Sequence, residues 1–217
     1  MRRAVLFDFG GVILTSPFEA FAAYERRHSL PDGFLRRVNQ TNSDTNAWAR
    51  LERSEITVSE FDVAFAVESG ALGYEVRGVE VLGLLAGEVR PEMVAALGWL
   101  RNDPRFTTGL LTNNFLSGPT QHLPPAWESV LAMFDVVVES SRVGVRKPDV
   151  AFYEIACAEL GIEPSEAVFL DDLGINLKPA AAMGMATVKV TDPLVALEEL
   201  ATHIDVALSD LLSATPN

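Results

Sequence analysis

The stretch that most constrains this chain is an apolar run near its start, which ends in one acid followed by two glycines. It covers Val5–Ile13 and reads VLFDFGGVI. A run of this kind is typical of a buried central strand. Burying the Asp8 carboxylate at the end of such a strand is unfavourable unless a cation or several donors face it. Ligands of open α/β sheets bind at the carboxyl ends of strands, so the sequence favours a site role for Asp8 over a helix cap.

Composition narrows the class of protein further. The chain has 217 residues, 48% of them hydrophobic, which is enough for one core domain with a smaller insert. The formal net charge of −13 argues against nucleic acid or a membrane surface as a partner, because both are polyanions. A single cysteine, Cys157, permits no intrachain disulfide. Asp8 interrupts the first apolar run and no cleavage site follows, so we expect a cytoplasmic protein.

Residues 17–89 carry helical spacing and no convincing strand pattern. Thr57 and Glu60 have the form of a capping box, which predicts a helix start. A polar loop is expected over residues 39–46. We therefore expect a helical cap domain at 17–89, inserted into a core domain made of 1–16 and 90–217.

Strands alternate with helices in the rest of the chain, which predicts an α/β fold. The expected architecture is a Rossmann-like, mostly parallel sheet with helices on both faces. The strands are expected at 107–112, 136–138, 167–170 and 186–190, and the helices at 91–101, 127–133, 148–160, 176–183 and 193–201.

Three of the expected strands end in polar side chains. Asp8 follows the first, Thr112-Asn113 closes the second, and Asp171-Asp172 follows a third. In a parallel sheet these ends share one edge, and carboxylates gathered there repel each other unless a divalent cation and a lysine such as Lys147 relieve the charge. Oxygen ligands of this kind suit Mg²⁺, which pairs naturally with phosphate.

Each of these residues has a plain structural interpretation when it is taken alone. Thr112 is then an ordinary strand residue, Lys147 a solvated loop charge, and Asp171-Asp172 a helix N-cap pair. Their joint occurrence, in this order and at these strand ends, is much harder to explain that way.

With these motifs in place, the chain resembles the haloacid dehalogenase-like hydrolase superfamily over nearly its whole length. The motifs are Asp8-Phe9-Gly10-Gly11-Val12, Leu111-Thr112-Asn113, Arg146-Lys147-Pro148-Asp149 and Phe169-Leu170-Asp171-Asp172 with Asn176 following. The stretches 48–57 and 170–180 look most like the branch that contains the phosphatase domain of soluble epoxide hydrolase.

The resemblance implies a Mg²⁺-dependent phosphatase that acts on a small phosphorylated metabolite. Asp8 would be the nucleophile that forms an aspartyl-phosphate, and Mg²⁺ would be held by Asp8, the Gly10 carbonyl and Asp172. The remaining implied roles are phosphoryl binding by Thr112 and Asn113, charge neutralisation by Lys147, and support from Asp171 and Asn176. Cap candidates to face the substrate are Asn42, Asn46, Trp48 and Arg50, although Trp48 is equally suited to packing within the cap.

One position departs from the family pattern. Most phosphatases of the superfamily carry a second Asp two residues after the nucleophile, and here that position is Gly10. Loss of a general acid and base can lower the rate roughly 10²- to 10⁴-fold. The alternative hypothesis is therefore a catalytically weakened relative that binds a phosphorylated ligand or a protein. A dehalogenase of small acids is less expected, because that chemistry runs without metal in the family.

Overall fold

The computed structural model describes residues 2–113 and 123–213. Its centre is a five-stranded sheet in the order β3-β2-β1-β4-β5, and every neighbouring pair of strands is parallel. The sheet confirms the predicted α/β class. The strands are β1 (Ala4–Phe7), β2 (Thr107–Thr112), β3 (Val136–Glu139), β4 (Ala167–Asp171) and β5 (Ala186–Lys189).

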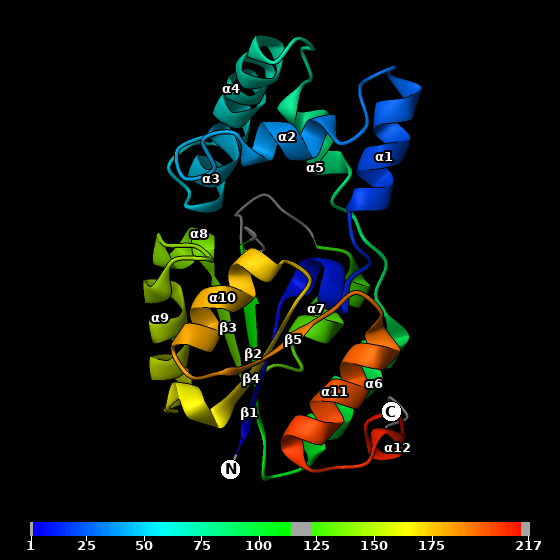
Figure 1. Cartoon of the computed structure of the whole chain (residues 1–217), viewed down its shortest axis with the longest axis vertical. Coiled ribbons are helices and arrows are strands. Elements are labelled where there is room, and N and C mark those ends of the chain that lie inside the picture. The colour runs from blue at the N-terminus through cyan, green and yellow to red at the C-terminus, as the bar shows by residue number, and fades with distance from the viewer. Residues whose placement is uncertain (1, 114–122, 214–217) are drawn as a thin grey trace.

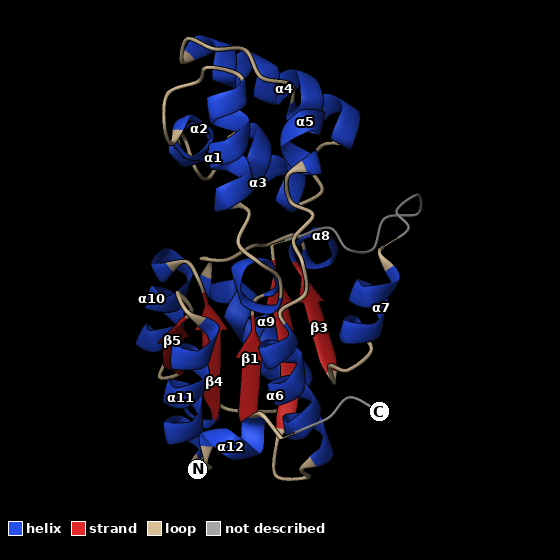
Figure 2. Cartoon of the chain, turned by 90° about the vertical axis from the view of Figure 1, so that its right-hand side faces the viewer, coloured by secondary structure: helices blue, strands red, loops and turns tan. Residues whose placement is uncertain are grey.

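Helices cover both faces of the sheet, because alternate strand residues point to opposite sides. Val5 and Phe7 pack into one hydrophobic cluster, against residues of α6, α11 and α12. Ala4 and Leu6 pack into the other, against residues of α9 and α10. Figure 2 shows the strands with helices packed against the sheet. Short helices α7 and α8 lie beside β3. The helices of the core are α6 (Pro91–Asn102), α7 (Pro125–Leu131), α8 (Ser140–Val143), α9 (Val150–Leu160), α10 (Gly174–Ala182), α11 (Pro193–Ile204) and α12 (Leu208–Leu211).

A separate group of helices sits over the carboxyl edge of the sheet (Figure 1). We call it the helical unit; it consists of α1 (Phe18–Arg27), α2 (Phe34–Gln40), α3 (Ala47–Glu52), α4 (Val58–Ala71) and α5 (Gly78–Gly83). The unit has its own hydrophobic cluster around Phe34, Phe61 and Phe65, all fully buried or nearly so. It therefore packs independently of the two clusters that flank the sheet.

Two neighbouring linkers join the helical unit to the sheet. Leu14 and Val89 form an isolated antiparallel bridge. On either side of it, the Thr15 amide donates to the Glu88 carbonyl at 2.8 Å and the Arg90 amide donates to the Ile13 carbonyl at 2.9 Å. The two linkers between the helical unit and the core are thus held together by antiparallel backbone hydrogen bonds.

Several predicted boundaries differ from the structure. Helix α9 begins at Val150 rather than 148, because the Asp149 side chain accepts from the Ala151 amide at 3.0 Å and caps the helix. Helix α10 begins at Gly174 rather than 176. The residue before it, Leu173, donates its amide to the Asp171 carboxylate at 2.8 Å. The predicted polar loop begins later than expected, since α2 runs through Gln40. The capping box predicted at Thr57 is present.

None of the helices within residues 2–113 and 123–213 has the length and apolar character needed to span a membrane.

Candidate active site

Asp8 stands one residue beyond the end of the central strand β1. Its amide donates to the Leu170 carbonyl at 2.9 Å, which ties it to the neighbouring strand β4. One carboxylate oxygen, Oδ1, accepts from the Phe9 amide at 2.7 Å and lies 2.9 Å from the Lys147 ammonium. Among the contacts of the described residues, none reaches the other oxygen, Oδ2. Asp8 is therefore anchored through one oxygen while the second remains available for chemistry.

Lys147 is the buried cation of the site. Its Nζ lies 2.8 Å from Oδ2 of Asp171 and 2.9 Å from Asp8, and it donates to the Leu111 carbonyl at 2.7 Å. An ammonium has three donors, and these contacts use all of them. With an exposed fraction of 1%, the side chain is fixed rather than solvated. The interpretation of Lys147 as a free loop charge is thus wrong for this structure.

Asp171 and Asp172 are adjacent in sequence but differ in environment. Asp171 is fully buried, and besides Lys147 it accepts from the Asn176 amide group at 3.0 and 3.1 Å and from the Leu173 amide. Asp172 is partly exposed and lines a cavity. Asp8, Asp171 and Asp172 each place a carboxylate oxygen within 4.8 Å of the others. Such a group of oxygens fits a divalent cation that keeps water ligands, as Mg²⁺ does.

Thr112 and Asn113 end strand β2 beside these acids. The Thr112 hydroxyl is buried, and within the described chain it has no hydrogen-bond partner. The Asn113 side chain donates to the Lys147 carbonyl at 2.9 Å and accepts from the Lys147 amide at 2.8 Å. Asn113 therefore fixes the backbone of Lys147, while the Thr112 hydroxyl is left free to bind an oxygen atom in the cavity.

Burial and neighbouring charges shift the pKa values of the acids and the lysine in the site. Burial raises the pKa of Asp8 to about 7; Lys147 opposes that shift, and the Asp171 and Asp172 carboxylates reinforce it. Burial and the neighbouring Asp171 raise the pKa of Asp172 to about 6. For Lys147 burial favours the neutral amine, yet Asp171 and Asp8 outweigh it and the pKa is raised. Metal binding at the acids would relieve their mutual repulsion.

A cavity of about 550 Å³ opens above these residues, between the sheet edge and the helical unit. Its floor includes Asp8, Gly10, Thr112, Lys147 and Asp172. Helix α2, which Figure 1 shows above the carboxyl edge of the sheet, contributes Arg36, Asn39 and Gln40 to the lining of the cavity. The helical unit and its linkers line it with apolar and aromatic side chains and with about as many polar or charged ones. The first group is Leu14, Pro17, Phe18, Phe21, Trp48 and Leu85, and the second is Thr15, Arg36, Asn39, Gln40, Ser43, Asp44 and Glu52.

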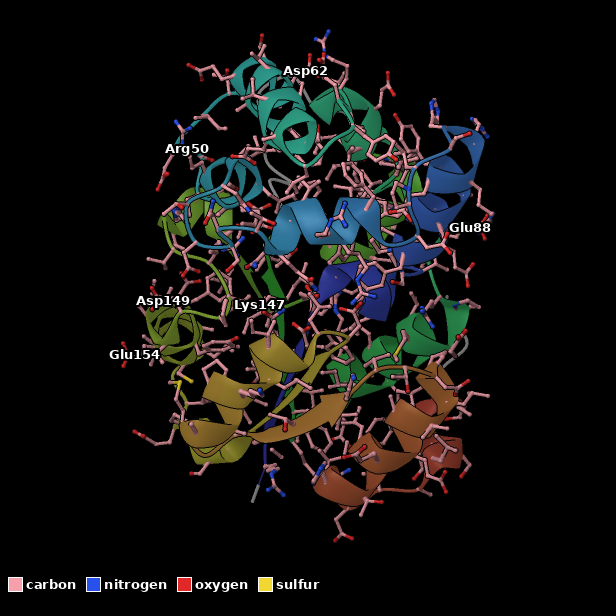
Figure 3. The ribbon with its side chains drawn as sticks, turned by 45° about the horizontal axis from the view of Figure 1, so that its top comes forward. Arg50, Asp62, Glu88, Lys147, Asp149 and Glu154 are labelled. Carbon is pink, nitrogen blue, oxygen red and sulfur yellow. The ribbon has the colours of Figure 1, made fainter. Side chains whose placement is uncertain are left out.

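Of the cap residues proposed from sequence, Trp48 lines the cavity and the other three do not. The Asn46 side chain is buried, caps α3 through the Ala49 amide at 2.9 Å, and donates to the Asn39 and Thr41 carbonyls. Arg50 is exposed on the outer side of α3, away from Lys147 (Figure 3). Asn42 is an exposed loop residue with a positive φ of 50°. These placements indicate structural or surface roles for Asn46, Arg50 and Asn42.

Sequence reasoning missed Arg36, Asn39 and Gln40. They are spaced as i, i+3 and i+4 on α2, so they share one face of that helix, and the structure turns this face toward the cavity. The spacing was readable, but the direction of the face is set by packing of α2 within the helical unit.

A family model for haloacid dehalogenase-like hydrolases matches residues 2–184. The chain belongs to the haloacid dehalogenase-like hydrolase family. The matched region takes in strands β1 to β4, the helical unit and all the motif residues described above, and it ends before β5.

Several proteins are similar in sequence to this chain over most of its length. The chain is 37% identical to acyl-CoA dehydrogenase family member 10 of Mus musculus and 34% identical to bifunctional epoxide hydrolase 2 of Sus scrofa, over 91% of its length in each case. It spans only 19% and 38% of those proteins. A sesquiterpene phosphatase of Aspergillus oryzae is 28% identical over 91% of this chain and 94% of its own. Phosphatases are therefore among the hydrolases related to this chain.

Solved structures of the family share its fold. One, a family enzyme of Bacteroides thetaiotaomicron in complex with magnesium and inorganic phosphate, superposes with a TM-score of 0.59. The match covers 88% of this chain and 96% of that one, at 20% identity. At this identity the likeness establishes the shared fold.

Proposed function

We propose that this family member is a Mg²⁺-dependent phosphomonoester hydrolase that works through a covalent intermediate on Asp8. The observation that carries the proposal is the group of three carboxylates, Asp8, Asp171 and Asp172, within 4.8 Å of one another and neutralised on one side by buried Lys147. A phosphoryl group brings further negative charge, so a cation at the acids is needed before it can approach. The relatives named as phosphatases support the same reaction class.

The donor set suits Mg²⁺ because it consists of oxygens alone. Asp8 and Asp172 would hold the ion together with the Gly10 carbonyl, while Asp171 is already occupied by Lys147 and Asn176. When bound, Mg²⁺ supplies positive charge next to the phosphoryl oxygens. The same charge would favour the ionised forms of Asp8 and Asp172, whose pKa values burial raises.

The chain's own residues account for the steps of transfer. Oδ2 of Asp8 attacks phosphorus, the bond to the leaving oxygen breaks, and the leaving group takes a proton from solvent. The Thr112 hydroxyl donates a hydrogen bond to a phosphoryl oxygen, and Lys147 offsets the negative charge on Asp8. Water then attacks the phosphorus of the aspartyl-phosphate, which releases inorganic phosphate and restores the Asp8 carboxylate. In this class of reaction, positioning and electrostatic stabilisation supply most of the acceleration.

The organic part of the substrate would lie in the upper half of the cavity. That half is lined by aromatic side chains such as Phe18, Phe21 and Trp48, together with polar and charged side chains that include Arg36 and Asp44. A phosphorylated small molecule with an apolar portion fits these surroundings. The activity named for one relative, on a sesquiterpene phosphate, is of this kind.

Gly10 favours a second candidate, a binding protein that has lost efficient turnover. No side chain at this position can donate a proton to the leaving group. Of the two acids beside Asp8, Asp171 is engaged by Lys147 and Asn176, and Asp172 is the proposed metal ligand. Such a protein would bind phosphate and release none from esters.

Phosphate release from a panel of phosphate monoesters, with Mg²⁺ or with a chelator, separates the two candidates. We expect release with Mg²⁺, none with the chelator, and none from the Asp8→Asn variant in either condition. Calorimetric binding of inorganic phosphate without turnover on any ester would instead support the binding protein. Turnover that persists in Asp8→Asn would exclude the covalent mechanism.

A further inference from the structure

One buried ion pair crosses from the helical unit to the core. Glu52 at the end of α3 pairs with Arg146, which comes directly before Lys147. Glu52 has an exposed fraction of 9%, and the guanidinium of Arg146 is also largely covered. Most other ion pairs of the described residues join groups within the unit or within the core and are partly exposed, for example Arg53 with Glu55 at 2.6 Å. The Glu52–Arg146 pair is thus unusual in both burial and location.

Further hydrogen bonds converge on the same point. The Ser140 hydroxyl of α8 donates to the Glu52 carbonyl at 2.6 Å, and Arg146 also donates to the Ser43 carbonyl at 3.1 Å. Within the unit, the Trp48 indole donates to Oε1 of Glu52 at 2.9 Å, while Arg146 takes Oε2. Both carboxylate oxygens and the carbonyl of Glu52 are therefore engaged, so its position is well defined.

This contact lies on the side of the molecule opposite the two linkers. In Figure 1, α3 stands directly above α8, while the linkers descend from α1 and α5 on the other side. The helical unit is consequently held at two separated places, by covalent linkers on one side and by Glu52, Arg146 and Ser140 on the other. Loss of the second contact would weaken the attachment of the unit on the side away from the linkers.

The pair also adjoins the residue that neutralises the nucleophile. Lys147 is fixed through its side chain by Asp8 and Asp171, and through its backbone by Asn113. Arg146, one residue earlier, is fixed by Glu52. A shift of Arg146 would be passed to the Lys147 backbone through the peptide bond between them, and a misplacement of about 1 Å at a reacting group can lower a rate up to about 100-fold.

We propose that Glu52 and Arg146 form a positioning pair: their contact closes the helical unit over the site and holds Lys147 in place against Asp8. The inference rests on the proposed phosphatase function for its kinetic consequence, and on the contacts alone for its structural one. Neither residue takes part in a chemical step. A pair that served stability only would leave the rate of each folded molecule unchanged.

Kinetics with a minimal substrate test the effect on Lys147. Acetyl phosphate is too small to need contacts with the helical unit, so its kcat reports on the core residues. We expect Glu52→Gln and Arg146→Gln each to lower this kcat by about 10- to 100-fold, and the double variant to lose no more than the worse single one. The matched control is Arg53→Gln, which breaks the neighbouring pair with Glu55 inside the unit and should retain the wild-type kcat.

Hydrogen exchange measured by mass spectrometry tests the closure without relying on activity. Glu52→Gln should raise exchange in core residues 140–147, and Arg146→Gln should raise it in unit residues 42–52, with β1 unchanged in both. Arg53→Gln should leave exchange in core residues 140–147 unchanged, although it also removes a hydrogen bond to the Asp44 carbonyl within the unit. Should a Gln variant fail to fold, Glu52→Asp and Arg146→Lys take its place, since each keeps the charge while losing the length or the fork of the wild-type side chain.

Different results would overturn the closure of the helical unit, the positioning of Lys147 or the proposed function. Unchanged exchange across the contact, or equal effects in Arg53→Gln, would overturn the closure. Raised exchange with an unchanged kcat on acetyl phosphate would overturn the positioning of Lys147. If wild-type protein releases no phosphate from any ester, the proposed function fails, while the exchange comparison still decides whether the pair closes the unit.

Discussion

Gly11 and Asp172 approach so closely that a Cβ atom at Gly11 would lie 2.4 Å from Oδ2 of Asp172. Gly11 also has a positive φ of 79°, in the region that favours glycine. The second glycine of the opening motif is therefore required for two reasons: the chain must turn after Asp8, and the Asp172 carboxylate must reach the backbone of that turn.

Gly11→Ala should displace Asp172 and weaken activation by Mg²⁺. We expect an increase in the Mg²⁺ concentration for half-maximal activity, together with a loss of roughly 1–2 kcal/mol of stability from the left-handed backbone. Gly33→Ala is the matched control, because Gly33 has a φ of 72° and no atom within 4 Å of its Cβ position. It should lose similar stability, measured by urea unfolding, and keep the wild-type Mg²⁺ response. Equal Mg²⁺ curves for wild type and Gly11→Ala would refute a metal role for Asp172 at this place.

The raised pKa of Asp8 predicts a pH dependence of stability in the metal-free protein. The folded-state pKa of about 7 lies above the ordinary value of 3.8, so the folded protein holds this proton more tightly than the unfolded chain. Stability from this group is present below about pH 4 and is lost as the pH rises through 7. Relative to Asp8→Asn, the wild type should therefore lose on the order of 2–4 kcal/mol between these limits.

Urea unfolding at a series of pH values measures that difference. Saturating Mg²⁺ should reduce or reverse it, because the ion favours the ionised carboxylate. A wild-type and an Asp8→Asn curve that stay parallel from pH 4 to pH 8 without metal would contradict the assigned shift.

The face of α2 above the cavity predicts which residues set substrate preference. Arg36→Ala should raise KM for phosphate esters with a large organic part and leave the inhibition constant of inorganic phosphate unchanged, since the proposed phosphate position is at the floor of the cavity. Arg37→Ala is the control from the next position. Both guanidinium groups lie over a phenylalanine ring, at 4.4 Å for Arg36 and 5.3 Å for Arg37, but only Arg36 lines the cavity. A similar change in KM for both variants would show a general effect of charge on the unit.

Gly10 predicts a strong dependence of rate on the leaving group. Without an acid at this position, log kcat/KM should fall steeply as the leaving-group pKa rises across a series of phosphate esters. Gly10→Asp should give a shallower slope. The site can accept the larger residue, because Gly10 has an ordinary φ of −71° and nothing lies within 4 Å of its Cβ position. A flat wild-type plot, with chemistry shown to limit the rate, would mean that another group protonates the leaving oxygen.

Much of the core could be predicted because its signals are local. Strand β2 was predicted at its observed bounds, and the polar strand ends at Asp8, Thr112 and Asp171 do share one edge. That outcome follows from parallel pairing, which aligns the carboxyl ends of strands whatever their separation in sequence. The burial of Lys147 was less readable, since a charged residue in a loop gives no sign of the cavity that will enclose it.

The helical unit shows what the sequence left open. Helical spacing indicated that residues 17–89 were helical, yet it did not indicate α5, whose short span begins and ends with glycine. It also pointed to Asn46 and Arg50 as substrate residues, whereas the cavity takes Arg36 and Asn39 from α2. Which face of each helix meets the core depends on how the helices pack together, and that is decided by contacts between distant residues such as Glu52 and Arg146.

A rapid-quench experiment with a radiolabelled phosphate ester tests the proposed transfer of a phosphoryl group to Asp8. Protein mixed with Mg²⁺ and substrate, quenched in acid within one turnover and digested, should carry the label on the peptide that contains Asp8. The label should be released by hydroxylamine, as expected for an acyl phosphate, and should be absent from Asp8→Asn. Phosphate release without label on that peptide at any time, or equal labelling of Asp8→Asn, would contradict the account.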